Sequence, residues 1–203
     1  MCGRVYFEPD HPELRELVKE MNRSRLAARF RKQPDEVLTA EGEIFPSAVL
    51  PVLAFSRGGE RRVFPMKWGF SGGKRLLINA RAETAAQKQT FREAWAKHRC
   101  AVPASWYFEW EHDEKQRAGQ KYALKPEGGN LIWLAGLYRM EAELPSFVIL
   151  TRPAAEGLAW MHDRMPVLLP GDAVLDWICP TGQPEPEDVI KKSLTQIIWE
   201  QAV

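Results

Sequence analysis

Cysteine is scarce in this sequence, and its copies are widely separated. Cys2, Cys100 and Cys179 form no CxxC pair, so neither a structural zinc site nor a framework of disulfide bonds is indicated. We therefore expect no metal and no cofactor. A reducing, intracellular setting fits this cysteine usage best.

Long apolar runs are also absent. No stretch approaches the roughly 20 apolar residues needed to cross a bilayer, and the first residues do not resemble a signal peptide. We therefore expect a cytoplasmic protein with no membrane partner. The 203 residues, of which 45% are hydrophobic, suffice for one well-buried core, so we predict a single domain over residues 1–203, present as a monomer.

A strong excess of either charge is missing from the whole chain, whose net charge is +1. The two halves differ, however. Residues 1–100 contain 19 Lys and Arg against 12 Asp and Glu, and residues 101–203 contain 9 against 15. This asymmetry permits a basic surface for nucleic acid without requiring one, because many of the arginines could equally lie on solvated helix faces.

Strand-type runs dominate the middle of the sequence, and helical patterns surround them. One helix is predicted from a cap at Asp10 to about Gln33, and another after Thr90 as its cap, with Glu93 reaching back. Later helical pieces cover 154–162, 172–178 and 186–194, and short β-type runs cover 49–55, 61–68, 99–104, 106–110, 121–125, 130–138 and 146–151. Without a βαβ rhythm, this order predicts an α+β domain on a curved, mostly antiparallel, barrel-like sheet with peripheral helices.

Four polar islands interrupt these elements: MCGR at the start, INARAET at 78–84, FEW at 108–110 and HDRMP at 162–166. Asn79 could be an ordinary turn residue, and a structural histidine is the simpler interpretation of His162 taken alone. Glu109 is more informative because it interrupts an aromatic strand, where a buried carboxylate is costly and is common at catalytic sites.

Cys2 directly follows the initiator methionine. If Met1 is removed, Cys2 carries a free α-amine and a thiol on adjacent carbons. No internal residue offers this pair of nucleophiles.

Together the islands resemble the SRAP (SOS response-associated peptidase) family, which shields abasic sites in single-stranded DNA. The resemblance runs through MCGR, MKWGF, INARAET, RCAVPASWYFEW, LTRPA and MHDRMPVLLP in the expected order. Two departures stand out: the segment between Trp68 and the INARAET island is short, and SWYFEW replaces the more usual Gly-Phe-Tyr approach to the Glu-Trp pair.

The resemblance implies a role for each island. After Met1 removal, Cys2 would bond covalently to the ring-opened abasic sugar and close a thiazolidine ring. Asn79 would bind near the amine and sugar, Glu109 would move protons during Schiff-base formation, and His162 would assist ring opening and reversal. The resemblance also implies DNA-binding residues, with arginines as phosphate clamps and a tryptophan as a stacking surface: Arg4, Arg81, Arg164 and Trp68.

Two other function classes fit some of these residues. An N-terminal-nucleophile glutaminase also begins Met-Cys-Gly, but it normally feeds ammonia to an attached synthetase domain, and it would not call for the HDRMP island. A tryptophan-rich nucleic-acid-binding module would leave Cys2 without a role. If the chain is bacterial, the SRAP interpretation implies action on replicating DNA in the nucleoid.

Overall fold

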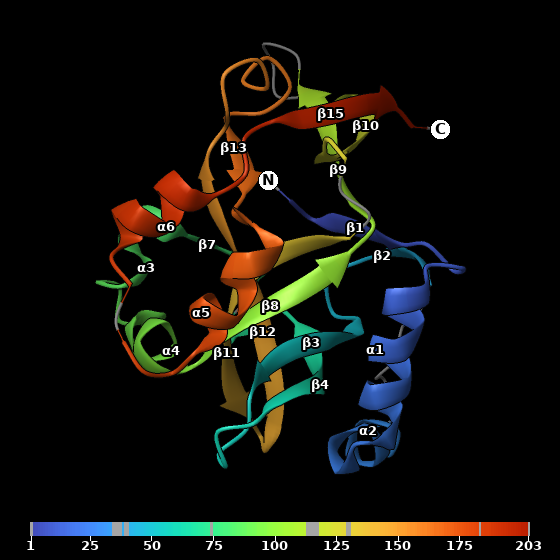
Figure 1. Cartoon of the computed structure of the whole chain (residues 1–203), viewed down its shortest axis with the longest axis vertical. Helices are drawn as coiled ribbons and strands as arrows, with labels where there is room; N and C mark the ends of the chain where they lie inside the picture. The colour runs from blue at the N-terminus through green and yellow to red at the C-terminus, as the bar shows by residue number, and fades with distance from the viewer. Residues whose placement is uncertain are drawn as a thin grey trace.

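A closed ring of five strands forms the centre of the molecule (Figure 1). The computed structural model describes residues 2–33, 38, 41–73, 75–112, 118–128, 131–182 and 184–202, with only the backbone at 112 and 118. The ring runs in the order β12–β4–β3–β8–β11 and back to β12, and all its pairings are antiparallel except that of β12 with β4. Its strands are β3 (Val49–Phe55), β4 (Arg61–Trp68), β8 (Arg99–Ala104), β11 (Ile132–Glu141) and β12 (Leu144–Pro153).

The ring closes because β12 is long enough to pair on both sides. Its residues 144–149 pair with β11, while Ser146 and Phe147 pair with β4. Closure gives each strand two neighbours and removes exposed sheet edges. A strand with neighbours on both sides can bury all its residues, and every residue of β8 is buried.

A second, antiparallel sheet of five strands lies beside the ring. Its order is β15–β10–β9–β1–β2, and Figure 1 shows β15, β10 and β9 together at the top of the view. The strands are β1 (Arg4–Phe7), β2 (Gly42–Ile44), β9 (Trp106–His112), β10 (Ala118–Pro126) and β15 (Ile197–Gln201). One apolar cluster includes buried side chains from this sheet and from the ring, so the two form one core.

Short strands and helices complete the fold. The strand β7 (Asn79–Arg81) runs parallel to β12 and follows the hairpin of β5 (Phe70–Gly72) and β6 (Arg75–Leu77). The strands β13 (Arg164–Pro166) and β14 (Leu168–Leu169) pair with β12 and β11.

The helices lie around the strands in two groups. Figure 1 shows α1 and α2 at one side, and α3, α4, α5 and α6 at the other. Their bounds are α1 (Pro12–Arg23), α2 (Arg25–Phe30), α3 (Ala82–Ala85), α4 (Arg92–Lys97), α5 (Val174–Ile178) and α6 (Pro186–Lys192), with a 3-10 turn η1 (Gly171–Ala173) before α5. The predicted α+β class, with a barrel-like sheet and peripheral helices, is confirmed.

Three predicted helices differ in detail. The first is interrupted at Ser24, whose extended backbone ends α1 and whose hydroxyl accepts from Ala27 N to cap α2. A serine favours such a cap over a helix interior. The cap of α1 is His11 and not Asp10, and α4 begins after Phe91 without a side-chain cap. The segment 154–162 forms turns and not a helix.

Candidate functional site

Cys2 lies two residues before β1 and is completely buried within the main apolar cluster. Burial, and next the nearby charge of Glu109, raises the pKa of its thiol well above the ordinary value. The thiol therefore stays protonated at neutral pH in this state. The side-chain amide Nδ2 of Asn79 donates a hydrogen bond to the Cys2 carbonyl oxygen over 2.9 Å, which fixes the start of β1 against β7.

Glu109 reaches the same region from β9. Its side chain is 4% exposed, so the predicted burial of this carboxylate is confirmed. Because side chains alternate along a strand, Tyr107 and Glu109 face the same side of the sheet. Val5 lies directly opposite Tyr107 across the β1–β9 pair, so the same sheet face brings both residues toward the N-terminal segment.

Two polar atoms around Cys2 have no hydrogen-bond partner among the described residues. They are the amide oxygen Oδ1 of Asn79 and the hydroxyl of Tyr107. A buried polar atom left unpaired costs free energy, and native proteins contain few of them. Such atoms beside a nucleophile are suited to bind the polar groups of a ligand.

His162 follows the turn segment 154–161 and precedes β13. The backbone N–H of Arg164 donates to its Nδ1 over 2.9 Å, and Oδ1 of Asp163 lies 2.8 Å from the same nitrogen. The first contact requires Nδ1 without a proton and the second requires it with one. Nδ1 of His162 therefore lies between a backbone hydrogen-bond donor and a carboxylate.

Arg164 is held inside the protein. Its guanidinium binds both carboxylate oxygens of Glu83 and donates to the carbonyl oxygen of Thr151 over 2.8 Å. Only 10% of its side chain is exposed. This geometry gives no support to the predicted role of Arg164 as a phosphate clamp. Instead the pair ties the INARAET turn to the HDRMP segment.

Arg4 and Arg81 differ in their contacts with other side chains. Arg4 donates to Glu43 over 2.7 Å, and its guanidinium lies 3.8 Å from the centre of the Phe45 ring. Glu43 also accepts from Lys121.

Arg81 is exposed and is the last residue of β7, the strand that begins with Asn79. Of the three predicted phosphate-binding arginines, Arg81 is the one whose position suits a phosphate.

Trp68 is part of the core. Its side chain is completely buried, its Nε1 donates to the carbonyl oxygen of Ile78 over 3.1 Å, and its ring stacks on Phe147. A ring without an exposed face cannot stack on a nucleobase unless the core opens. The structure therefore gives no support to the predicted stacking role of Trp68.

Sequence reasoning missed Tyr107, Glu83 and Glu43. The alternation of the 106–110 run signals that residues 107 and 109 share a face, which could have identified Tyr107. Nothing local in the sequence indicates the acidic partners of Arg4 and Arg164, because both lie far away along the chain.

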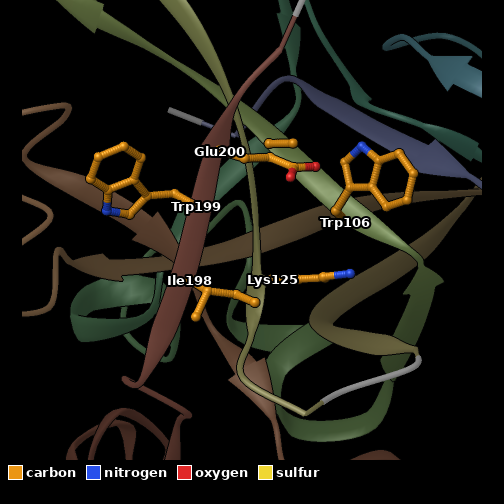
Figure 2. Close-up of a pocket in the computed structure, with 6 residues that line it drawn as sticks. Trp106, Lys125, Ile198, Trp199 and Glu200 are labelled. Carbon is orange, nitrogen blue, oxygen red and sulfur yellow. The ribbon is translucent and has the colours of Figure 1, made fainter.

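A small cavity of about 60 Å³ lies on the second sheet and contains none of the predicted site residues (Figure 2). Its lining comes from β9, β10 and β15: Trp106, Ala123, Lys125, Ile198, Trp199 and Glu200. In the described part of the chain, no three His, Cys, Asp or Glu side chains gather to hold a metal ion. No described helix is both long and apolar enough to cross a membrane.

Comparison with known proteins gives consistent matches along the whole chain. The model of the family described as SOS response associated peptidase (SRAP) matches residues 1–201. The abasic site processing protein YobE of Bacillus subtilis is 33% identical over 158 residues, which cover 69% of this chain and 71% of that protein. The abasic site processing protein YoqW of Bacillus subtilis is 32% identical over 198 residues, covering 89% and 81%.

Solved structures share the fold. A protein from Bacteroides thetaiotaomicron aligns with a TM-score of 0.73 at 18% identity, covering 98% of this chain and 91% of that chain. A phage-related protein from Bordetella bronchiseptica aligns with a TM-score of 0.73 at 22% identity, covering 99% and 94%.

Proposed function

The chain belongs to the SOS response associated peptidase (SRAP) family, and from this premise we propose that it processes abasic sites in DNA by bonding covalently to them through Cys2. The observation that carries the proposal is the position of Cys2. It is the residue that removal of Met1 would make N-terminal, and it lies beside Asn79, Glu109 and two buried polar atoms without partners among the described residues.

Removal of Met1 is the step that creates the nucleophile. The family name suggests that the chain catalyses this cleavage on itself, and the proposal includes that activity. An α-amine with a pKa of about 7.7 is roughly one-sixth unprotonated at pH 7, whereas a lysine near 10.4 is free about once in 2500. The N-terminal amine is thus the better supplied nucleophile.

The reaction uses the open-chain aldehyde of the abasic sugar. The amine adds to the aldehyde carbon, water leaves, and a Schiff base forms. The thiol of Cys2 then adds across the C=N bond, its sulfur to carbon and its hydrogen to nitrogen, and closes a five-membered thiazolidine. Only three atoms, Cβ, Cα and N, separate the thiol from the reacting carbon, so the thiol has a high effective concentration and ring closure makes the adduct persist.

The neighbouring groups divide the remaining tasks. Asn79 positions Cys2 through its carbonyl oxygen. Glu109 moves protons between amine, carbinol and leaving water, and His162 assists opening of the sugar and the reverse reaction. The exposed Arg81 binds a backbone phosphate. Single-stranded DNA is the proposed substrate because an unpaired lesion can enter a buried site. If the chain is bacterial, this substrate implies action on replicating DNA in the nucleoid.

The test is intact mass spectrometry of the purified protein before and after addition of abasic single-stranded DNA. We expect loss of Met1, then a heat-stable adduct whose mass equals protein plus DNA minus one water. Cys2→Ala should give no stable adduct. A residue inserted between Met1 and Cys2 should also prevent it, because the Cys2 nitrogen then stays in a peptide bond.

An equal adduct yield from Cys2→Ala would refute the thiazolidine. Undiminished crosslinking by the insertion variant would show that the α-amine is not the nucleophile. Ammonia release from glutamine by the wild type would instead favour a glutaminase.

A further inference from the structure

Tyr107 carries a hydroxyl that the proposed mechanism has not used. Its side chain is 1% exposed, and its oxygen has no hydrogen-bond partner among the described residues. The adjacent Phe108 faces the other side of β9, where it contacts the Tyr6 ring and the amine of Lys121. The chain therefore places a phenol on the face directed at Cys2 and a phenyl ring on the opposite face.

A phenylalanine at position 107 would fill the same space without an unpaired hydroxyl. Burying a hydroxyl without a partner is unfavourable, so packing alone does not account for it. Unsatisfied groups that a fold retains at a site are commonly satisfied by the ligand. Asn79 presents a second such atom, its Oδ1, in the same site.

Tyr107 lies in the same buried cluster as Cys2 and on the same face of β9 as Glu109. Burial is the main cause that raises the pKa of Tyr107, and the nearby charges of Cys2 and Glu109 add to it. The phenol therefore remains neutral over the whole ordinary pH range. It is a permanent hydrogen-bond donor and not a base.

We propose that Tyr107 is a further catalytic residue, whose hydroxyl donates a hydrogen bond to the aldehyde oxygen of the abasic sugar while the Cys2 amine adds. This inference rests on the proposed function. It gives the orphaned hydroxyl a partner that is present only when the lesion is bound.

The step balances without any further reactant. The nitrogen lone pair forms the C–N bond, and the C=O π pair moves onto oxygen, where the Tyr107 hydrogen bond stabilises the developing charge. Both protons of the amine pass in turn through Glu109 to that oxygen: the first gives the carbinolamine, and the second lets water leave as the neutral C=N bond forms. Tyr107 keeps its own proton throughout.

Tyr107→Phe removes the hydroxyl and keeps the ring. We expect Schiff-base formation, measured by borohydride trapping over time, to slow by about 10²-fold, which is the size of effect seen when one oxyanion donor is lost. The melting temperature should stay the same or rise, because an unsatisfied hydroxyl is gone. Slower chemistry with undiminished stability is a result that a structural role does not produce.

The matched control is Tyr138→Phe, which makes the same change in a separate cavity beside His98. It should trap at the wild-type rate. Exchange of the neighbours in Tyr107→Phe/Phe108→Tyr should not restore the rate, because the hydroxyl then lies on the opposite face of β9.

The outcomes separate the two proposals. A wild-type trapping rate for Tyr107→Phe overturns the role of Tyr107 and leaves the proposed function intact. A slow variant with a lowered melting temperature, or one with a shifted pH–rate profile, overturns the role of a neutral donor. Failure of wild-type protein lacking Met1 to form any adduct overturns the proposed function and with it this inference.

Discussion

At the scale of single residues, the site combines a nucleophile with few protein partners and several groups that can move or share protons. Cys2 is held through its carbonyl oxygen by Asn79, and burial keeps its thiol protonated at neutral pH. Glu109 lies in the buried strand, whereas His162 lies in a turn next to Asp163. Their different surroundings suit different steps of one reaction.

Glu109→Gln and His162→Gln should therefore change the rates of adduct formation and reversal in different ways. Glu109→Gln keeps the shape but cannot shuttle protons, so adduct formation should slow by roughly 10²–10⁴. His162→Gln should slow both formation and reversal, giving an adduct that forms late and persists longer. The measurement is a time course in which preformed adduct is chased with excess unlabelled abasic DNA. Wild-type release by the His162 variant, or wild-type formation by the Glu109 variant, contradicts these roles.

At the scale of elements, the site depends on contacts between segments that are far apart in the chain. The Glu83–Arg164 pair joins the turn after β7 to β13, and Thr151 on β12 completes it. Hydrogen bonding to Arg164 lowers the pKa of Glu83. The carboxylate therefore contributes stability above about pH 4.3, the ordinary glutamate value, and loses it as the pH falls further through the lowered value.

Glu83→Gln should lower the melting temperature at pH 7, and the difference from wild type should shrink as the pH falls below about 4.3. The expected loss at neutral pH is about 1–3 kcal/mol, because the buried Arg164 loses a charged hydrogen-bond partner. Thermal melts of both proteins across this pH range measure it. Exposed Glu60, which pairs with Arg62, supplies the control: Glu60→Gln should change stability by less than about 1 kcal/mol at any pH. A Glu83 effect that does not shrink on acidification would contradict the ion pair.

At the scale of the whole molecule, the uneven charge of the two halves does not separate in space. The central ring takes β3 and β4 from the basic half and β11 and β12 from the acidic half, while β8 crosses the boundary between them. Several arginines of the first half pair with glutamates, as Arg4 does with Glu43 and Arg29 with Glu143. If the chain binds DNA as proposed, exposed cations near Cys2 such as Arg81 should contribute most to the affinity.

Arg81→Ala should weaken binding to single-stranded DNA of every sequence alike, since phosphate contacts carry no base information. The slope of log affinity against log salt should fall by about 0.7 for one lost phosphate contact. A binding titration at several salt concentrations with two unrelated sequences tests this, and Arg62→Ala serves as the control. Loss confined to one sequence would exclude a phosphate contact.

The sequence by itself determined several strands and the burial of one carboxylate. The predicted runs 49–55, 61–68 and 99–104 match β3, β4 and β8 to the residue, because dense apolar and β-branched stretches bounded by turn residues specify strands locally. The burial of Glu109 was predictable from its aromatic neighbours, and the proposal of Cys2 as the nucleophile rests on its position in the sequence.

Only the tertiary structure decided which charged side chains form ion pairs and which polar atoms are buried. Arg4, Arg81 and Arg164 are alike in sequence, yet Glu43 and Glu83 pair with two of them across long chain separations. Trp68 and the hydroxyl of Tyr107 are both buried, one as part of the core and one beside Cys2. Strand pairing in both sheets brings distant segments of the chain together and so determines these neighbours, which a local sequence pattern cannot do.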